Sequence, residues 1–447
     1  MNLYLIGHDY RYAAEQMLLT LFPDERPVYP DGRPTGDRAE LRLMSGAKVT
    51  TATCVLVYQG RTANGRTSVP NEELTDPNET DRRLQGAVKR AFYRAAMGIG
   101  LPHRPWGMLT GVRPGKLMTP LLAQGMGDVQ AARYFERHYD VAPARAALVV
   151  RTAHATLRAM DSLGEKDVCL YVGIPFCPTR CAYCSFVSQS VEKSMALVPE
   201  FLQALAREIA ATAKAVQRAG LRIVSLYIGG GTPTIMLDEL CKTIDLARDN
   251  FSIKEVSSET NPNHLVQPWL NELKGRVQRL SVGVQSFNND LLKQMDRYHK
   301  YGSGEEIFER IGEAVPYFDS LNVDMIFNFP SQTEDILFSD LEKIVECGAR
   351  QTTFSPLYIS SATTRKMVET LGRMDYNREY RYYQILDGVL AGGDHPFFER
   401  DTIWTFTRLN DQGKKDVELP FEELQVSYNE YPAIGSGSIT HLNGCLY

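Results

Sequence analysis

The sequence predicts an α/β fold: a (β/α)6 partial barrel of the TIM type, preceded by a small α/β N-terminal domain. Two observations predict the barrel. Six short β-rich runs follow residue 167, and helical stretches separate them. Strands that alternate with helices form parallel sheets with right-handed crossovers, and such sheets bend into barrels. We expect three regions: the N-terminal domain at residues 1–160, the partial barrel at 165–360, and a short C-terminal cover at 361–447.

The N-terminal region carries the patterns of both strands and helices. Leu3–Gly7 and Thr51–Tyr58 read as strands, and Arg11–Leu21 and Asp81–Met97 have helical periodicity. The polar stretch Gln59–Asp81 is expected to be an exposed connection.

The barrel region is more regular. Its predicted strands are Leu170–Ile174, Val224–Ile228, Glu255–Glu259, Arg279–Val284, Leu321–Phe327 and Gln351–Pro356. Its predicted helices are Pro199–Arg218, Leu237–Asn250, Asn289–Asp296, Gly304–Val315 and Glu334–Glu346.

Composition narrows the class of protein. The 447 residues are 43% hydrophobic and 23% charged, as in soluble globular proteins. The net charge of −5 gives no reason to expect nucleic acid as a partner. No apolar run approaches the roughly 20 residues of a membrane span. The eight cysteines show no pairing logic, so we expect a cytoplasmic protein.

Three of these cysteines form the most informative motif. Cys177, Cys181 and Cys184 have the spacing C-x3-C-x2-C, directly after the first barrel strand. Three thiolates can hold three irons of a 4Fe–4S cluster and leave the fourth iron open, where S-adenosylmethionine (SAM) can chelate it. A zinc site would need a fourth ligand, and His154 is distant in sequence. The loop therefore predicts an iron–sulfur cluster, with zinc or unrelated core thiols as alternatives.

A glycine cluster ends the second barrel strand. In Tyr227-Ile-Gly-Gly-Gly-Thr-Pro-Thr234, the glycines allow close approach of a ligand, and their exposed amides would suit a carboxylate. Taken alone, such a cluster is most often a tight turn. Its position after the second strand of a barrel favours binding, because ligands gather at the carboxyl ends of parallel strands.

Polar residues end the next three strands as well. Glu259 ends the third, Gln285 ends the fourth with Arg297 after it, and Asp324 lies within the apolar fifth. A buried carboxylate is costly unless it is paired or hydrogen-bonded, so a structural network is the alternative for Asp324.

At these motifs the chain resembles the radical SAM enzymes of the oxygen-independent coproporphyrinogen III oxidase type, the HemN-like family. The resemblance covers Val168 to Pro356 and implies that the three cysteines hold a 4Fe–4S cluster. The loop Gly173–Phe186 and the segments Tyr4–Tyr10 and Trp106–Pro114 resemble the HemZ branch, the coproporphyrinogen dehydrogenases. The resemblance also implies these SAM contacts: Tyr171, Tyr183, Gly230, Gly231, Thr232, Glu259, Gln285, Arg297 and Asp324.

The family's activity follows as an expectation. A one-electron donor such as flavodoxin or ferredoxin would reduce the cluster, and SAM cleavage would yield a 5′-deoxyadenosyl radical. Oxidative decarboxylation of two propionates would convert coproporphyrinogen III to protoporphyrinogen IX. Arg180 and Lys300 are candidate partners for the substrate carboxylates.

Departures from the family's pattern keep alternatives open. The segments Arg297–Gly304 and Asn322–Gln332 look less like HemZ than like other HemN-like proteins. Phe186 stands where well-understood oxidases have a fourth cysteine, an absence shared with HemW-like haem chaperones. A haem-binding role would use an axial ligand such as His264 or His299. The chain stops soon after its glycine-rich segment Gly435–Ser438, where relatives continue, so we expect a truncated cover. Another HemN-like enzyme acting on tetrapyrroles is the third alternative.

Overall fold

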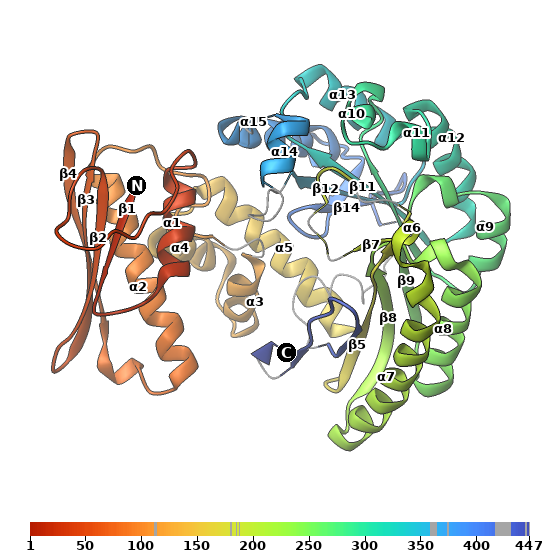
Figure 1. Ribbon diagram of the computed structural model, residues 1–447, viewed down its shortest axis with the longest axis horizontal. Coiled ribbons are helices and arrows are strands. Elements are labelled where there is room, and N and C mark those ends of the chain that lie inside the picture. Colours follow the sequence, from red (N-terminus) through yellow and green to blue (C-terminus); the bar gives the residue numbers. More distant parts are fainter. Residues whose placement is uncertain are drawn as a thin grey trace. The chain divides into compact units, whose positions relative to one another are not determined.

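The computed structural model describes residues 1–110, 114–178, 181–184, 186, 188–357, 364–372, 375–415, 431–442 and 445–446 (Figure 1). The chain forms two compact units, Met1–Arg151 and Thr152–Tyr447. Across the described chain, no helix has the length and apolar content needed to cross a bilayer.

The first unit is built on a four-stranded sheet in the order β1-β2-β3-β4. β1 pairs parallel with β2, and the other pairs are antiparallel. Helix α2 packs against the sheet, and α1 packs against α2. The strands are β1 (Asn2–Ile6), β2 (Arg38–Ser45), β3 (Val49–Tyr58) and β4 (Arg61–Pro70); the helices are α1 (Arg11–Leu21), η1 (Asn71–Glu73), α2 (Pro77–Gly98), α3 (Gly115–Ala123), α4 (Asp128–Tyr139) and α5 (Pro143–Asp161), which continues into the second unit.

The predicted exposed connection at Gln59–Asp81 is wrong in its first half, because β4 lies there and pairs with β3 along its whole length. The strand is polar because it is an edge strand with one face exposed. Its other face lies close to α2: a Cβ atom at Gly65 would lie 1.9 Å from the Ala91 carbonyl oxygen. A strand that packs through glycine carries no apolar signal in the sequence.

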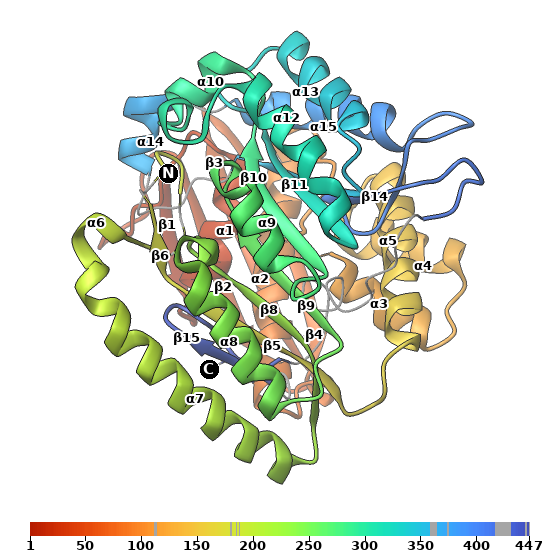
Figure 2. The same ribbon diagram turned by 90° about the vertical axis from the view of Figure 1, so that its right-hand side faces the viewer.

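The second unit is built on an open nine-stranded sheet in the order β13-β14-β12-β11-β10-β9-β8-β5-β15. Its six central strands are parallel, which confirms the predicted partial barrel. Helices connect them, and Figure 2 shows α7 and α8 over one face of the sheet. The central strands are β5 (Asp167–Ile174), β8 (Arg222–Gly230), β9 (Glu255–Thr260), β10 (Arg279–Gln285), β11 (Ser320–Phe327) and β12 (Gln351–Pro356).

The connecting helices follow the predicted order. Side chains cap two of them at the N-terminus: Ser303 forms a capping box with Glu306 at α12, and the Thr333 hydroxyl accepts from the Ile336 amide at α13. The helices are α6 (Val191–Ser194), η2 (Met195–Leu197), α7 (Val198–Ala219), η3 (Pro233–Met236), α8 (Leu237–Asn250), η4 (Pro262–His264), α9 (Gln267–Leu273), α10 (Asn289–Gln294), α11 (Tyr298–Tyr301), α12 (Gly304–Ala314), η5 (Val315–Tyr317), α13 (Glu334–Glu346), α14 (Thr364–Leu371) and α15 (Tyr376–Ala391).

The C-terminal segment supplies strands to both edges of this sheet. β14 pairs antiparallel with β12, and β15 pairs parallel with β5. The Gly435 amide at the end of β15 donates to the Glu208 carboxylate of α7 at 2.8 Å. The segment predicted as a cover therefore extends the sheet; that it also covers a substrate stays a prediction. The remaining strands are β6 (Phe176–Cys177), β7 (Gln189–Ser190), β13 (Phe398–Arg400), β14 (Thr405–Arg408), β15 (Ala433–Gly435), β16 (His441–Leu442) and β17 (Cys445–Leu446).

Candidate functional site

The parallel strands present one row of partly exposed side chains near their carboxyl ends. Tyr171 on β5 pairs in register with Tyr227 on β8, and Gly283 on β10 pairs with Asp324 on β11. Paired positions in neighbouring strands lie on the same face. Glu259 on β9 belongs to this face too, because it pairs with Ser281, two residues before Gly283. The structure thus brings the predicted strand-end residues together on one face of the sheet.

The cysteine loop follows β5 at this end of the sheet. Its first thiol belongs to β6, which pairs with β7 and so shapes the loop. Cys177, Cys181 and Cys184 are partly exposed and form no disulfide. Four cysteines outside the loop are buried, as expected of structural thiols: Cys54, Cys169, Cys241 and Cys347.

Two of the loop thiols receive hydrogen bonds. The Thr232 hydroxyl donates to Cys177 Sγ at 3.6 Å, and Arg297 Nη1 donates to Cys181 Sγ at 3.3 Å. Donors to sulfur stabilise thiolates and tune iron–sulfur clusters, so these thiols fit a cluster. No group of three His, Cys, Asp or Glu side chains in the described chain is arranged around a single metal ion. A cubane makes no such demand, because each thiolate binds a different iron.

Arg297 anchors the loop to the sheet. Its side chain is buried, with 2% of the residue exposed. Its Nη2 donates to the Gly283 carbonyl oxygen, and its Nη1 also donates to the Tyr183 hydroxyl at 3.2 Å. The guanidinium stacks 4.3 Å from the ring centroid of Tyr301. Arg297 and Tyr183 thus hold the loop in place, and their predicted contacts with SAM stay predictions.

The glycine turn is bound to the same loop. The Gly231 amide donates to the Ile174 carbonyl at 2.7 Å, and the Thr232 amide donates to the Phe176 carbonyl at 2.7 Å. The prediction that the glycine amides are exposed for a ligand is therefore wrong for Gly231. A Cβ atom at Gly231 would lie 2.4 Å from the Phe176 carbonyl oxygen, so glycine is needed for this close packing.

Glu259 accepts a hydrogen bond from the Tyr227 hydroxyl at 2.7 Å. Burial raises the pKa of Glu259 to about 7, and the nearby Asp324 charge adds to the effect. Gly229 leaves room for this carboxylate, since a Cβ atom there would lie 2.8 Å from Glu259 Oε1. Near neutral pH the carboxyl exists in both forms, which allows it to accept from, or donate to, a polar ligand.

Asp324 belongs to a hydrogen-bonded structural network. Such a network is the alternative to SAM binding that the sequence left open for this residue. Its carboxylate accepts from the Ser281 hydroxyl at 2.6 Å and from Asn322 Nδ2 at 2.7 Å. Burial raises its pKa. The network therefore fixes the orientation of the carboxylate on the shared face, where the residue as a whole is partly exposed.

Gln285 ends β10 in a left-handed conformation, with φ of 77°. Such a conformation is uncommon for a residue other than glycine, and it concentrates at functional sites. A Cβ atom at Gly283 would lie 2.9 Å from Gln285 Nε2, so the side chain folds back over its own strand.

The candidate haem ligands and the candidate partners of the substrate carboxylates differ in their surroundings. His264 is buried: Thr234 Oγ1 lies 2.9 Å from its Nδ1, and its ring stacks on Trp269. Burial lowers its pKa to about 4, and this enclosure gives it a structural role. His299 is exposed, and Lys300 is paired with Asp296. Arg180, like residues 111–113 of the Trp106–Pro114 segment, lies outside the described residues.

Sequence reasoning missed the groups that position these residues. Ser281 and Asn322 hold Asp324, and Asn261 Nδ2 donates to the Thr232 hydroxyl at 2.7 Å. Counting back in steps of two from Gly283 and Asp324 would have placed Ser281 and Asn322 on the same face. The role of Asn261 depends on a contact between β8 and β9 that no periodicity reveals.

Comparison with known proteins identifies a domain over this part of the chain. The family model described as the radical SAM superfamily matches residues 171–344. The chain is 28% identical to the oxygen-independent coproporphyrinogen-III oxidase-like protein HemZ of Bacillus subtilis over 273 residues, which cover 57% of this chain and 53% of HemZ. It is 28% identical to the heme chaperone HemW of Bacillus subtilis over 284 residues, or 61% of this chain and 71% of HemW.

Two further matches come from Escherichia coli. The chain is 31% identical to its oxygen-independent coproporphyrinogen III oxidase over 198 residues, or 43% of this chain and 42% of the oxidase. The solved structure of coproporphyrinogen III oxidase (HemN) has the same fold, with a TM-score of 0.52 at 24% identity over 66% of this chain and 69% of that one. The chain thus spans about half the length of HemZ and less of the oxidase.

The radical SAM superfamily uses a 4Fe–4S cluster and SAM, the two cofactors predicted from the cysteine loop. The polar face lies beside the cysteine loop, where two thiols receive hydrogen bonds, and this arrangement fits both groups. The chain therefore carries a radical SAM domain over residues 171–344 and is a relative of the HemN, HemZ and HemW proteins.

Proposed function

We propose that this protein is a radical SAM oxidoreductase that converts coproporphyrinogen III to protoporphyrinogen IX by oxidative decarboxylation. One observation carries the proposal: the partly exposed residues Glu259 and Asp324 share a sheet face at the end where the cysteine loop begins. A sheet face with these polar groups beside a cysteine loop is more useful for catalysis than for the binding and transport of haem alone. The similarity to HemZ supports the choice of substrate.

Cys177, Cys181 and Cys184 would hold the 4Fe–4S cluster. When bound, the cluster and SAM supply a 5′-deoxyadenosyl radical. Thr232 and Arg297 would keep the thiolates in position through their hydrogen bonds to sulfur. Glu259, with its pKa of about 7, is suited to accept from an ammonium or ribose hydroxyl group. We also propose that the nine residues named above as SAM contacts bind SAM.

The electron balance of the proposed decarboxylation determines which redox partners the enzyme needs. Each propionate loses one hydrogen atom from its β-carbon, one electron and carbon dioxide, and a vinyl group remains. SAM cleavage accepts the hydrogen atom and consumes one electron. The enzyme therefore needs a one-electron donor, such as flavodoxin or ferredoxin, and a one-electron acceptor for the substrate electron.

An anaerobic assay tests this function. The reduced protein, given SAM and coproporphyrinogen III, should form protoporphyrinogen IX while methionine and 5′-deoxyadenosine accumulate in step. The matched control is Cys241→Ala, which removes a buried thiol outside the loop and should retain turnover. Release of 5′-deoxyadenosine without a vinyl product, together with tight stoichiometric haem binding, would overturn the oxidase assignment.

The second candidate is a haem chaperone like HemW. Phe186 favours it: this ring stands where the oxidases have a fourth cysteine, and 69% of the residue is exposed. An exposed apolar ring beside a cluster loop suits contact with an apolar ligand. Because the buried His264 is held by Thr234, the exposed His299 is the better axial ligand. If the chaperone function holds, His299→Ala should weaken haem binding measured by absorbance titration.

A further inference from the structure

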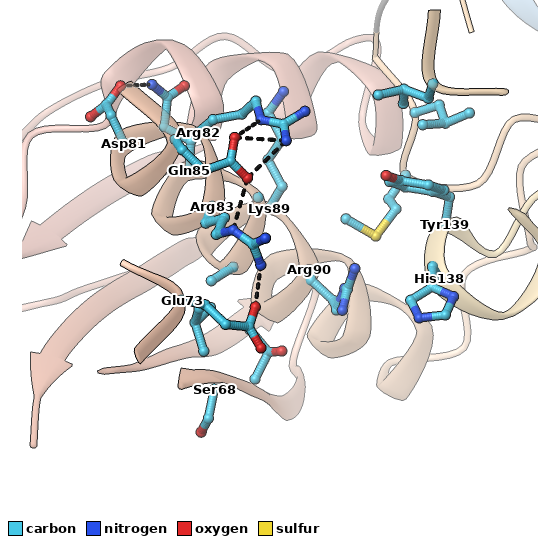
Figure 3. A pocket seen from close by; sticks show the side chains of 18 of the residues that line it. Ser68, Glu73, Asp81, Arg82, Arg83, Gln85, Lys89, Arg90, His138 and Tyr139 are labelled. Carbon is cyan, nitrogen blue, oxygen red and sulfur yellow. Dashed lines mark hydrogen bonds and ion pairs between the residues drawn. The ribbon is translucent and has the colours of Figure 1, made fainter. Parts of the chain in front are cut away.

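The first unit contains a cavity of about 770 Å³, and none of its lining residues belongs to the site described above. Figure 3 shows it lined by side chains of α2 on one side and by Tyr139 and His138 of α4 on the other. Its volume lies within the range of about 300–1,000 Å³ typical of small-molecule sites.

Four cationic side chains of α2 line the cavity, and two of them are already neutralised. Arg82 pairs with Glu79 at 2.7 Å. Arg83 pairs with Glu79 at 2.8 Å and also with Glu73. Asp81, the remaining acid of the lining, accepts from Gln85. These acids are therefore engaged, and Figure 3 shows Glu73 and Asp81 on the side of the cavity away from His138 and Tyr139.

Lys89 and Arg90 have no carboxylate partner among the described residues. Lys89 Nζ donates to the Thr110 hydroxyl at 2.8 Å. Arg90 Nε is buried and has no hydrogen-bond partner in the described structure. Burial lowers the pKa of both groups. Two adjacent, partly buried cations without a counter-charge are costly to the fold, and an anionic ligand would remove that cost.

The opposite side of the cavity is aromatic. The Tyr134 and His138 rings stack with centroids 3.9 Å apart and an interplanar angle of 21°. Tyr139 and Met108 add flat and apolar surface. Aromatic faces beside a charged group bind planar molecules that carry an anion.

We propose that this cavity binds a small planar aromatic molecule bearing a phosphate or carboxylate group. The anion would lie on Arg90 and Lys89, because the guanidinium fork and the ammonium group both donate to oxyanions. The aromatic part would pack against Tyr139 and the Tyr134–His138 stack. This site is independent of the proposed function of the second unit.

The test uses the full-length protein and three probes. Adenosine 5′-monophosphate presents a phosphate, benzene-1,3-dicarboxylate presents carboxylates, and inorganic phosphate presents the anion alone. By isothermal titration calorimetry, one aromatic probe should bind with a Kd below about 1 mM, and more tightly than inorganic phosphate. The preferred probe then tells which anion the site selects. Failure of both aromatic probes to bind at ten times that concentration would overturn the proposal.

Matched variants locate the binding. Arg90→Gln should weaken the binding of the preferred probe by about tenfold or more. Arg94→Gln is the control: Arg94 lies on the same helix, is exposed, donates to the Arg66 carbonyl and does not line the cavity. It should leave the affinity unchanged. Equal losses in the two variants would overturn the proposal.

Thermal unfolding shows whether a loss of binding in Arg90→Gln comes from a folding defect. Without ligand, Arg90→Gln should unfold at the same temperature as the wild type or higher, because it removes a partly buried unpaired cation. With the preferred probe, the wild type should gain stability and the variant should not. If Arg90→Gln fails to fold, Lys89→Gln is compared with the wild type in the same way. If the probe raises the unfolding temperature of Lys89→Gln as much as that of the wild type, the proposed site is contradicted.

Discussion

Arg297 Nη1 lies 3.3 Å from Cys181 Sγ, while Nη2 of the same guanidinium donates to the Gly283 carbonyl oxygen. One side chain thus joins the cysteine loop to the end of β10. Because the arginine is buried and stacked on Tyr301, its position is strongly restrained. The geometry of the thiols therefore depends on a residue over a hundred positions away in sequence.

Replacing this arginine should change the cluster. Arg297→Lys keeps the charge and loses the planar fork and the stacking on Tyr301, so the hydrogen bond to sulfur should weaken. We expect the midpoint potential of the reconstituted cluster to become more negative, measured by an EPR-monitored redox titration. Arg381→Lys, an exposed arginine paired with Glu334, is the control and should leave the potential unchanged. An unaltered potential in both variants would refute the anchoring role.

The three loop thiols should account for the whole cluster. Anaerobic reconstitution should give about four irons per protein. Cys177→Ala, Cys181→Ala or Cys184→Ala should each abolish the cluster absorbance. Cys241→Ala and Cys347→Ala remove buried thiols outside the loop and should retain it. Full iron content in the triple-alanine variant would show that the cluster, if any, lies elsewhere.

The carboxyl groups on the shared face should contribute to SAM binding. Glu259→Ala and Asp324→Ala should each weaken the affinity by about 1–3 kcal/mol, the value of one polar contact, while the cluster stays in place. Equilibrium dialysis with labelled SAM measures the loss, and iron analysis checks the cluster. Glu342→Ala, an exposed acid on α13, is the control. Wild-type affinity in both site variants would remove these residues from the SAM site.

Glu259 should also make stability depend on pH in the absence of SAM. Its pKa is about 7 in the folded protein and 4.5 as an ordinary glutamate, so the folded state binds more protons between these values. Stability must therefore fall as pH rises from 4.5 to 7. Urea unfolding of the wild type and of Glu259→Gln should show a smaller decline in the variant. Identical pH slopes for the two proteins would contradict the raised pKa.

Two glycines of the first unit should respond oppositely to alanine. Gly65→Ala places a Cβ atom 1.9 Å from the Ala91 carbonyl oxygen, so β4 or α2 must move. We expect a loss of about 1–3 kcal/mol or more in the free energy of unfolding. Gly86→Ala meets nothing within 4 Å in the middle of α2 and should gain about 0.5–1 kcal/mol. Chemical denaturation measures both, and a stable Gly65→Ala would mean that the strand and helix are less closely packed.

Much of the second unit was predictable from local pattern. The six parallel strands have apolar, β-branched cores and are separated by amphipathic helices, so each element carries its own signal. The cysteine loop is equally local, because its three thiols lie within eight residues. Strand order follows from the rule that successive parallel strands lie side by side.

Other features needed the tertiary structure. β4 is polar because it is an edge strand that packs through Gly65, and β15 joins the sheet beside a strand more than 250 positions earlier. The amides of Gly231 and Thr232 look available in sequence, yet they bind the backbone before the cysteine loop. The sequence by itself determined the alternating strands, the helices and the cofactor chemistry of the three cysteines, because these depend on neighbours along the chain. Only the tertiary structure decided which polar groups are engaged and which stay exposed, because hydrogen bonds and close packing join residues whose separation in sequence carries no signal.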